Sequence, residues 1–166
     1  MAASASMPGS GSLTSPGRWA PEPEREQEMA LTDAEIGYLR TQQIGRLATI
    51  QPDGSPQVKP VGFRYNPGLG TIDVTGFSLT ASQKFRNVSR NGHAALVIDD
   101  IASKDPWRVR FLEIRGTAEA ITAAGGTPGP GDTAVIRIHP TRVLSFGVEE
   151  PPGEPHQTRL RTRNLP

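Results

Sequence analysis

The segment from Thr80 to Asn87 has the residue types and spacing of a helix start that binds an anion. Thr80 and Gln83 have the S/T-x-x-E/Q spacing of a capping box, which predicts a helix over about 81–90. The first turn of a helix presents backbone N–H groups and the positive end of the helix dipole. We therefore expect this turn to hold a phosphate group.

Side chains around this turn add to the predicted phosphate site. Ser82 supplies a hydroxyl, and Lys84 and Arg86 supply positive charge. Lys59 and Arg64 lie on a predicted strand upstream, so cations from two elements are expected to converge. These groups predict that the protein holds a phosphorylated cofactor.

Backbone and aromatic groups near the helix start suit a planar ligand. Gly76-Phe77-Ser78-Leu79 is a small, flexible approach to the helix, of the kind that lets the backbone meet a ligand. Trp107 and Phe111 are the aromatic residues best placed to cover a ring. Packing in a core or in a dimer would account for them equally well.

Other kinds of catalytic site have little support in the sequence. The three histidines, His93, His139 and His156, suggest no Ser/His/Asp set and form no H-x-x-H motif. The chain has no P-loop and no G-x-G-x-x-G fingerprint. It also has no cysteine, which excludes a zinc–thiolate site, a disulfide and a thiol nucleophile.

Composition predicts one folded domain between two tails. The chain has 166 residues, and 1–28 is rich in Ser, Gly, Pro and Glu. This segment and the Pro- and Arg-rich end over 149–166 are expected to be disordered, which leaves 29–148 as the folded domain. Three tail arginines are expected to be solvated, namely Arg159, Arg161 and Arg163.

Charge and hydropathy limit the partners and the location. The formal net charge is +1, so no global field attracts nucleic acid or an anionic membrane. No apolar run approaches the roughly 20 residues that span a bilayer, and the N-terminus lacks the apolar region of a secretory signal. We expect a cytoplasmic protein that binds neither membrane nor nucleic acid.

Hydrophobic periodicity predicts a mainly β (α+β) fold. A helix over about 33–42 starts at a capping box of Thr32 and Glu35. Alternating and β-branched segments joined by short turns then predict an antiparallel barrel with loops over 100–108 and 125–131. About seven strands are expected, over 46–50, 57–65, 71–75, 93–99, 109–118, 134–139 and 141–146.

The second predicted strand contains an irregularity. Pro60-Val61-Gly62 breaks the alternation of apolar and charged residues over 57–65. Pro and Gly inside a strand indicate a bulge, a sheet edge or a close approach of the backbone to another group. The sequence leaves all three alternatives open.

Two early segments resemble the opening strands of the pyridoxamine 5′-phosphate oxidase-like superfamily: Gly45–Ile50 and Asp53–Val61. Ser82-Gln83-Lys84 resembles the Ser-Arg-Lys phosphate clamp of the flavin-binding members. Lys84–Val88 resembles the Lys-x-Arg-Asn-Leu run of members that use the deazaflavin coenzyme F420.

A later pair of segments, Asp99–Trp107 and Glu113–Gly116, is similar to one subgroup of F420-dependent enzymes. The resemblance therefore covers about 31–148. It implies a split β-barrel that forms a homodimer, with the cofactor in a groove at the dimer interface.

The resemblance also implies a set of cofactor contacts. Gln57, Lys59, Pro60 and Val61 would lie beside the ring. Thr75 and Gly76 would lie beside the ribityl chain or phosphate. The helix start would surround the phosphate with Ser82, Gln83, Lys84, Arg86 and Asn87. The resemblance assigns no catalytic acid or base. Lys59 or Arg64 would stabilise charge that develops on the ring or the substrate.

The function expected first is that of an F420-dependent oxidoreductase, which transfers a hydride between the deazaflavin and a small unsaturated or conjugated substrate. Gln83 stands where the flavin-binding oxidases have Arg, and a less cationic clamp suits the singly charged phosphodiester of F420 better than the phosphate of FMN. An FMN-binding reductase or oxidase and a non-catalytic F420 carrier remain alternatives. A more distant alternative is a barrel that binds single-stranded nucleic acid through Phe63 and Tyr65.

Overall fold

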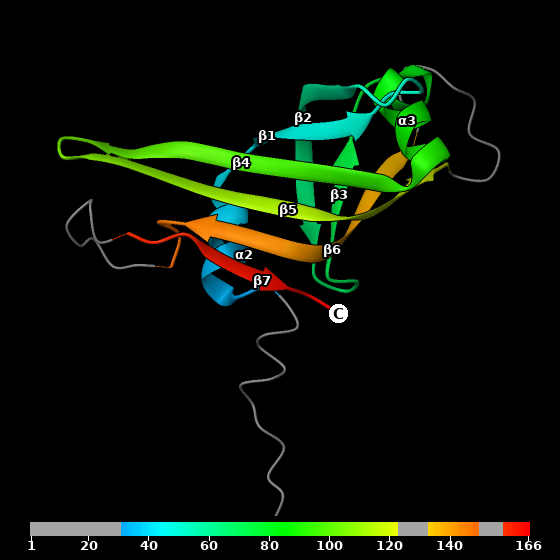
Figure 1. Ribbon diagram of the computed structural model, residues 1–166. Helices are drawn as coiled ribbons and strands as arrows, with labels where there is room; N and C mark the ends of the chain where they lie inside the picture. The colour runs from blue at the N-terminus through cyan, green and yellow to red at the C-terminus, as the bar shows by residue number, and fades with distance from the viewer. Residues whose placement is uncertain (1–30, 123–132, 150–157) are drawn as a thin grey trace, which may run out of the picture.

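The computed structural model describes residues 31–122, 133–149 and 158–166 (Figure 1). The predicted tail over 1–28 and the predicted loop over 125–131 lie outside these residues. In chain order the elements are α2 (Asp33–Thr41), β1 (Ile44–Ile50), β2 (Pro56–Asn66), β3 (Thr71–Thr75), the short 3-10 helix η1 (Leu79–Ala81), α3 (Gln83–Asn91), β4 (His93–Lys104), β5 (Trp107–Ile121), β6 (Val135–Phe146) and β7 (Arg161–Asn164).

The strands form one antiparallel sheet that closes on itself. Their order is β3-β2-β1-β4-β5-β6-β7, and β3 also pairs with β6. This additional pairing closes the first six strands into a ring, and β7 extends the sheet from the second half of β6. The predicted antiparallel barrel is therefore confirmed.

Inward-facing aliphatic side chains fill the ring. They alternate with outward-facing residues along each strand, as the pleat of a strand requires. Each fully buried side chain of this type stabilises the fold by about 1.5–3 kcal/mol. The fully buried members include Leu47, Ile72, Leu96, Leu112, Ile136 and Ile138.

β6 is one continuous strand, so the prediction of two strands over 134–139 and 141–146 was wrong. Pro140 lies at a register shift, where it opposes Gly116 on β5. A Cβ at Gly116 would lie 1.9 Å from the carbonyl oxygen of His139, so only glycine permits this close approach. The proline is tolerated because it stands at an irregularity of the ladder rather than within it.

The predicted loop over 100–108 is instead the end of a long hairpin. β4 continues to Lys104 and β5 begins at Trp107, and Figure 1 shows this hairpin extending beyond the barrel. Ile101 pairs with Val109, and Ser103 pairs with Arg108. The sequence hides these strands because both faces of the hairpin end are largely exposed, so apolar and polar residues do not alternate there.

The C-terminal residues contradict the predicted disordered tail over 149–166. Residues 150–157 lie outside the described part, but β7 pairs with Arg142–Ser145 of β6. Two of the arginines expected to be solvated form ion pairs, Arg161 with Glu149 and Arg163 with the buried Glu35. The Arg163 pair attaches β7 to the start of α2, and the Arg161 pair attaches it to the segment that follows β6.

Helix α2 starts as predicted. Thr32 Oγ1 accepts from the backbone N–H of Glu35 at 3.2 Å, and the Glu35 carboxylate accepts from the N–H of Thr32 at 2.9 Å. The capping box is thus confirmed. In the part of the chain that the structure describes, no helix is long and apolar enough to cross a membrane.

Candidate cofactor site

Helix α3 starts two residues later than the sequence pattern indicated. Its N-cap is Ser82, whose Oγ accepts from the N–H of Phe85 at 3.3 Å and donates to the carbonyl of Leu79 at 2.6 Å. Thr80 belongs to η1, so the predicted capping box with Gln83 is wrong. Leu79–Ala81 form the 3-10 turn that precedes Ser82, and the hydroxyl of Ser82 then caps the helix.

Gln83 and Asn87 lie one above the other on α3 and connect it to the sheet. Gln83 Nε2 donates to Asn87 Oδ1 at 2.8 Å, and Asn87 Nδ2 donates to Thr49 Oγ1 on β1 at 3.0 Å. Asn87 and Thr49 are both buried. Asn87, expected at the phosphate, therefore holds the helix against the barrel, and Thr49 is a contributor that the sequence did not indicate.

Arg86 is held close to the start of α3. Its guanidinium donates to Gln83 Oε1 at 3.0 Å and to the carbonyl of Ala81 at 2.7 Å. Both acceptors are uncharged, so the positive charge is positioned but not neutralised by them. Gln83 thus holds the guanidinium of Arg86 in place at the helix start.

Lys84 on α3 and Lys59 on β2 lie close enough to repel each other. Burial lowers the pKa of Lys84, and the charge of Lys59 lowers it further. Among the described residues, no carboxylate lies within 4.0 Å of either ammonium group. Two neighbouring cations without a carboxylate form a site that an anion would stabilise.

The predicted ring-binding residues divide between the two faces of β2. Gln57, Lys59 and Val61 alternate on the inward face, and Pro60 lies on the outward face. Pairing with β1 runs without a shift from Pro56 to Gly62, so the predicted phase break does not occur. The structure therefore brings Gln57 and Lys59 toward Lys84 and places Pro60 on the other side of the sheet.

The first half of β2 is a sheet edge, one of the three alternatives that the sequence left open. Residues 56–61 pair with β1, whereas β3 pairs only with 62–66. Within the described chain, no strand covers the other side of 56–61. Pro60 is tolerated at such an edge, and backbone groups of this segment remain available to a ligand.

Gln57 carries a buried oxygen without a hydrogen-bond partner. Its Oε1 is buried, and no donor among the described residues forms a hydrogen bond with it. Leaving a buried acceptor unpaired costs about 1–3 kcal/mol. Because Gln57 opposes Thr49 in the ladder, this acceptor lies on the same inward face as the Thr49–Asn87 contact. It is available to a donor on a bound ligand.

Three other residues from the sequence predictions lie away from this site. Arg64 is on the outward face of β2, opposite to Lys59. Of the two strand cations expected to converge with the helix start, Lys59 therefore does so and Arg64 does not. Phe63 and Tyr65, the residues of the nucleic-acid alternative, are partly buried and pack against the core. Both also line a pocket at the start of β2–β3 pairing, together with Arg64.

The connection from β3 to α3 passes the site. Thr75 ends β3 and is exposed, as is Gly76 after it. Phe77 follows with 80% of its surface exposed, and Ser78 adopts a left-handed conformation with φ of 53°. A non-glycine residue with this φ is uncommon, and the turn sends the chain directly into η1 and the start of α3.

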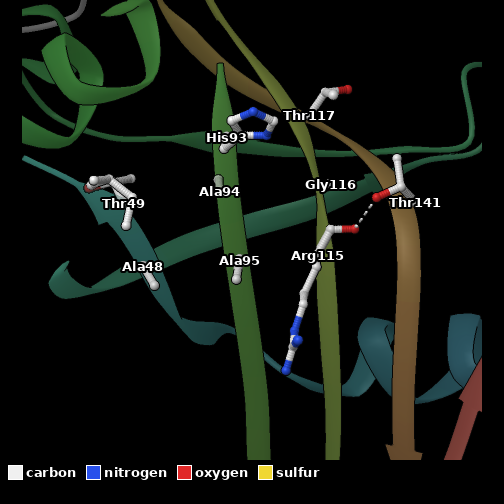
Figure 2. Close-up of a pocket in the computed structure, with 10 residues that line it drawn as sticks. Ala48, Thr49, His93, Ala94, Ala95, Arg115, Gly116, Thr117 and Thr141 are labelled. Atoms are coloured by element: carbon white, nitrogen blue, oxygen red, sulfur yellow. Dashed lines mark hydrogen bonds between the residues drawn. The ribbon is translucent and has the colours of Figure 1, made fainter. Parts of the chain in front are cut away.

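Two pockets on the described surface do not include Gln57, Lys59 or Lys84. One pocket of about 330 Å³ lies over β1, β4, β5 and β6, with His93, Ala95, Arg115 and Thr141 in its wall (Figure 2). A second, of about 470 Å³, includes Thr75. We place the candidate site at Gln57, Lys59 and Lys84 because two positive charges and one unpaired buried oxygen lie together there. No cluster of three or more potential metal ligands occurs in the described residues.

The closed ring with an open β2 edge beside a helix start defines the chain as a split β-barrel. The chain belongs to the pyridoxamine 5′-phosphate oxidase family, whose model matches residues 31–146. The family resemblance predicted from the sequence is therefore confirmed.

Individual relatives extend this comparison. The chain is 43% identical over 122 residues to a 5a,11a-dehydrotetracycline/5a,11a-dehydrooxytetracycline reductase of Streptomyces rimosus, covering 73% of this chain and 86% of the relative. It is 32% identical over 90 residues to the F420H2-dependent biliverdin reductase of Mycobacterium tuberculosis, covering 53% and 58%.

A solved structure confirms the fold. The heme binding protein of Mycobacterium smegmatis matches with a TM-score of 0.57 and 18% identity, over 79% of this chain and 57% of that protein. Both curated relatives are reductases, which supports an oxidoreductase function for the chain.

Proposed function

We propose that this protein is an F420-dependent oxidoreductase that transfers a hydride between the deazaflavin and a small unsaturated or conjugated organic substrate. The observation that carries the proposal is the Lys59–Lys84 pair beside the buried, unpaired Oε1 of Gln57. When bound, the deazaflavin would supply the hydride chemistry, and the protein would supply binding, orientation and charge.

The lysine pair suits the anionic part of such a cofactor. A phosphodiester between the two ammonium groups would offset their repulsion and replace part of the water that burial removes from Lys84. Arg86, held at the helix start by Gln83 and Ala81, would add a third cation. Ser82 would contribute through the helix start that it caps.

The β2 edge suits the ring. Gln57 Oε1 would accept from a ring N–H, and the open side of 56–61 would offer backbone groups to the ring oxygens and nitrogens. Lys59, on the same face as Gln57, would stabilise negative charge that develops on the ring. Thr75 and Gly76 would lie along the chain that joins ring and phosphate.

The relatives support this choice of cofactor and substrate. One is named an F420H2-dependent reductase, and the other reduces a dehydrotetracycline. We therefore include conjugated polycyclic compounds in the substrate class. An FMN-dependent reductase of the same fold is the second candidate, because the three cations would also hold a phosphate monoester.

We also propose that the working unit is a homodimer with the cofactor groove at its interface. The site on one chain is open on the free side of β2, so a second chain is needed to cover the ring. The experiment that tests the function is a screen for oxidation of reduced F420 by conjugated acceptors, with dehydrotetracycline and biliverdin among them. Turnover would support the proposal, and FMN-dependent turnover alone would contradict it.

A further inference from the structure

The chain has three lysines, and two of them lie together. They are Lys59, Lys84 and Lys104. Lys84 is the second residue of α3 and is half-buried, whereas Lys59 on β2 and Lys104 at the end of β4 are exposed. Figure 1 shows the tip of the β4–β5 hairpin and α3 at opposite sides of the molecule. The chain therefore holds one half-buried lysine with a lysine neighbour, and one exposed lysine away from that helix.

Contacts that do not involve the lysines themselves fix Lys84 beside Lys59. Asn87, three residues after Lys84, lies on the same face of α3 and donates to Thr49 on β1 at 3.0 Å. Thr49 opposes Gln57 in the β1–β2 ladder, and Lys59 follows two residues later on the same face of β2. Because Asn87 and Thr49 are buried, this contact holds the helix start over the strand that carries Lys59.

Three features disfavour the protonated form of Lys84. Burial removes water from its ammonium group and lowers its pKa, and the charge of Lys59 lowers the pKa further. Lys84 also lies in the first turn of α3, where the positive end of the helix dipole opposes a cation. Near neutral pH, a larger share of Lys84 than of an ordinary lysine is therefore an uncharged amine.

The elements around Lys84 supply no counter-ion. Among the described residues, no carboxylate lies within 4.0 Å of the ammonium group of Lys84 or Lys59. Arg86 on α3 is itself a cation and donates to two uncharged acceptors. The 3-10 helix η1 contains no titratable residue, and β5 meets α3 at the other end of the helix. The charges in reach of Lys84 are thus positive.

An amine that is desolvated beside another cation is a nucleophile toward carbonyl compounds. We propose that Lys84 is a carbonyl-reactive residue, whose amine forms an imine with an aldehyde that carries a carboxylate or phosphate group, and that Lys59 binds this anionic group. The half-buried lysine supplies the nucleophile, and its exposed neighbour supplies the cation that selects the aldehyde.

The proposed reaction needs no oxidant or reductant. The lone pair of Lys84 Nζ attacks the carbonyl carbon, a C–N bond forms, and the π electrons of the carbonyl move to its oxygen, which takes up a proton. The carbinolamine then loses water, because nitrogen releases a proton and the C–O bond breaks with its electron pair on oxygen. One amine and one aldehyde give one imine and one water. F420 takes no part, so failure of the proposed function would leave this reactivity standing.

Reductive trapping tests the proposal. The wild type is incubated near pH 7 with 4-formylbenzoate, sodium borohydride added after timed intervals reduces the imine to a stable amine, and peptide mass mapping locates it. We expect Lys84 to be modified about tenfold faster than Lys104. Accessibility alone predicts the reverse order, because Lys104 is exposed and Lys84 is half-buried. Equal or faster modification of Lys104, or none at Lys84, would overturn the proposal.

A neutral probe tests the role assigned to Lys59. Methyl 4-formylbenzoate has no anionic group, so it should modify Lys84 several-fold more slowly than 4-formylbenzoate does. Lys59→Gln should abolish this preference, whereas Lys59→Arg, which keeps a cation, should retain it. Equal rates for the two probes in the wild type, or a preference that survives in Lys59→Gln, would overturn the proposal.

The pH profile with the neutral probe separates the effect on the amine from binding of the anionic group. Lys59→Gln should slow the modification of Lys84 near pH 7, because the pKa of Lys84 moves back toward its ordinary value. Wild type and variant should differ least near pH 10, where an ordinary lysine is also partly uncharged. Lys104→Arg is the matched control and should leave the profile of Lys84 unchanged. Identical profiles for wild type and Lys59→Gln would contradict the proposal.

Discussion

Burial of Lys84 on α3, and after it the charge of Lys59 on β2, lower the pKa of Lys84, so two cations that are distant in sequence interact beside the open edge of the barrel. The sheet and the helix are held in this relation by the hydrogen bond from Asn87 to Thr49. The proposed function depends on this arrangement, in which the described residues place positive charge without a neighbouring carboxylate.

Removal of the Lys84 ammonium group should weaken cofactor binding without unfolding the protein. We expect Lys84→Ala to raise the Kd for F420 between about tenfold and a hundredfold, because a charge-assisted contact to the phosphodiester is lost. The melting temperature should change little, since repulsion from Lys59 is removed as well. Arg90→Ala, which deletes a cation near the other end of the same helix, is the control in the same titration.

Gln83 should influence the choice between F420 and FMN. Gln83→Arg adds a cation at the helix start, and we expect the ratio of FMN affinity to F420 affinity to rise about tenfold. Gln83→Ala separates this charge effect from the loss of the contacts to Arg86 and Asn87. An unchanged ratio in parallel titrations of both variants would show that this position does not select the cofactor.

The Asn87–Thr49 hydrogen bond should stabilise the fold rather than bind the cofactor directly. Asn87→Ala leaves the Thr49 hydroxyl buried without this donor and should lower the free energy of unfolding by about 1–3 kcal/mol. Thr49→Val combined with Asn87→Ala should cost less than the sum of the two single changes. A urea-unfolding double-mutant cycle measures this coupling, and strict additivity would contradict it.

Asp100 should contribute stability that is lost in acid. Hydrogen bonds from Arg110 lower the pKa of Asp100, and Tyr38 and Gln42 also donate to its carboxylate. A carboxyl with a lowered pKa in the folded state stabilises above its unfolded pKa of about 3.9, and this stability disappears as the pH falls below it. Asp100→Asn should therefore destabilise the protein at pH 7 and differ little from wild type near pH 2. A constant difference across an unfolding series at these pH values would refute the assignment.

The C-terminal strand should be required for stability through Arg163. Arg163→Ala leaves the Glu35 carboxylate buried without its cation and should cost about 3–5 kcal/mol in the free energy of unfolding. Burial already raises the pKa of Glu35, so the charged form is the costly one. Adding Glu35→Gln to Arg163→Ala should recover much of the loss. Thermal unfolding of the single and double variants tests this, and no recovery would argue against a role for the pair.

Local sequence patterns predicted the elements whose residues pack against the core. The alternating, apolar and β-branched segments and the capping box of Thr32 and Glu35 are local signals, and the structure has strands and a helix start at these positions. Strand β7 was missed because its residues, Arg161–Asn164, show no apolar pattern. They are held by β6 and by carboxylates that are distant in sequence.

The candidate site was predictable where its residues form a local sequence pattern. Lys84, Arg86 and Ser82 are neighbours in sequence, so a helix start could be inferred from their types. The start was misplaced at Thr80 because the 3-10 turn before Ser82 has no distinct sequence signal. Lys59 and Arg64 lie on opposite faces of β2 because the pairing of β2 with β1 runs without a register shift. The proline and glycine in β2 obscured this regular pairing in the sequence.

The most direct test of the central claim is a paired titration of the purified protein with F420 and with FMN, run beside Lys84→Ala. We expect the wild type to bind F420 more tightly than FMN and Lys84→Ala to bind both cofactors more weakly. Tighter binding of FMN by the wild type, or an unchanged F420 affinity in Lys84→Ala, would contradict the claim.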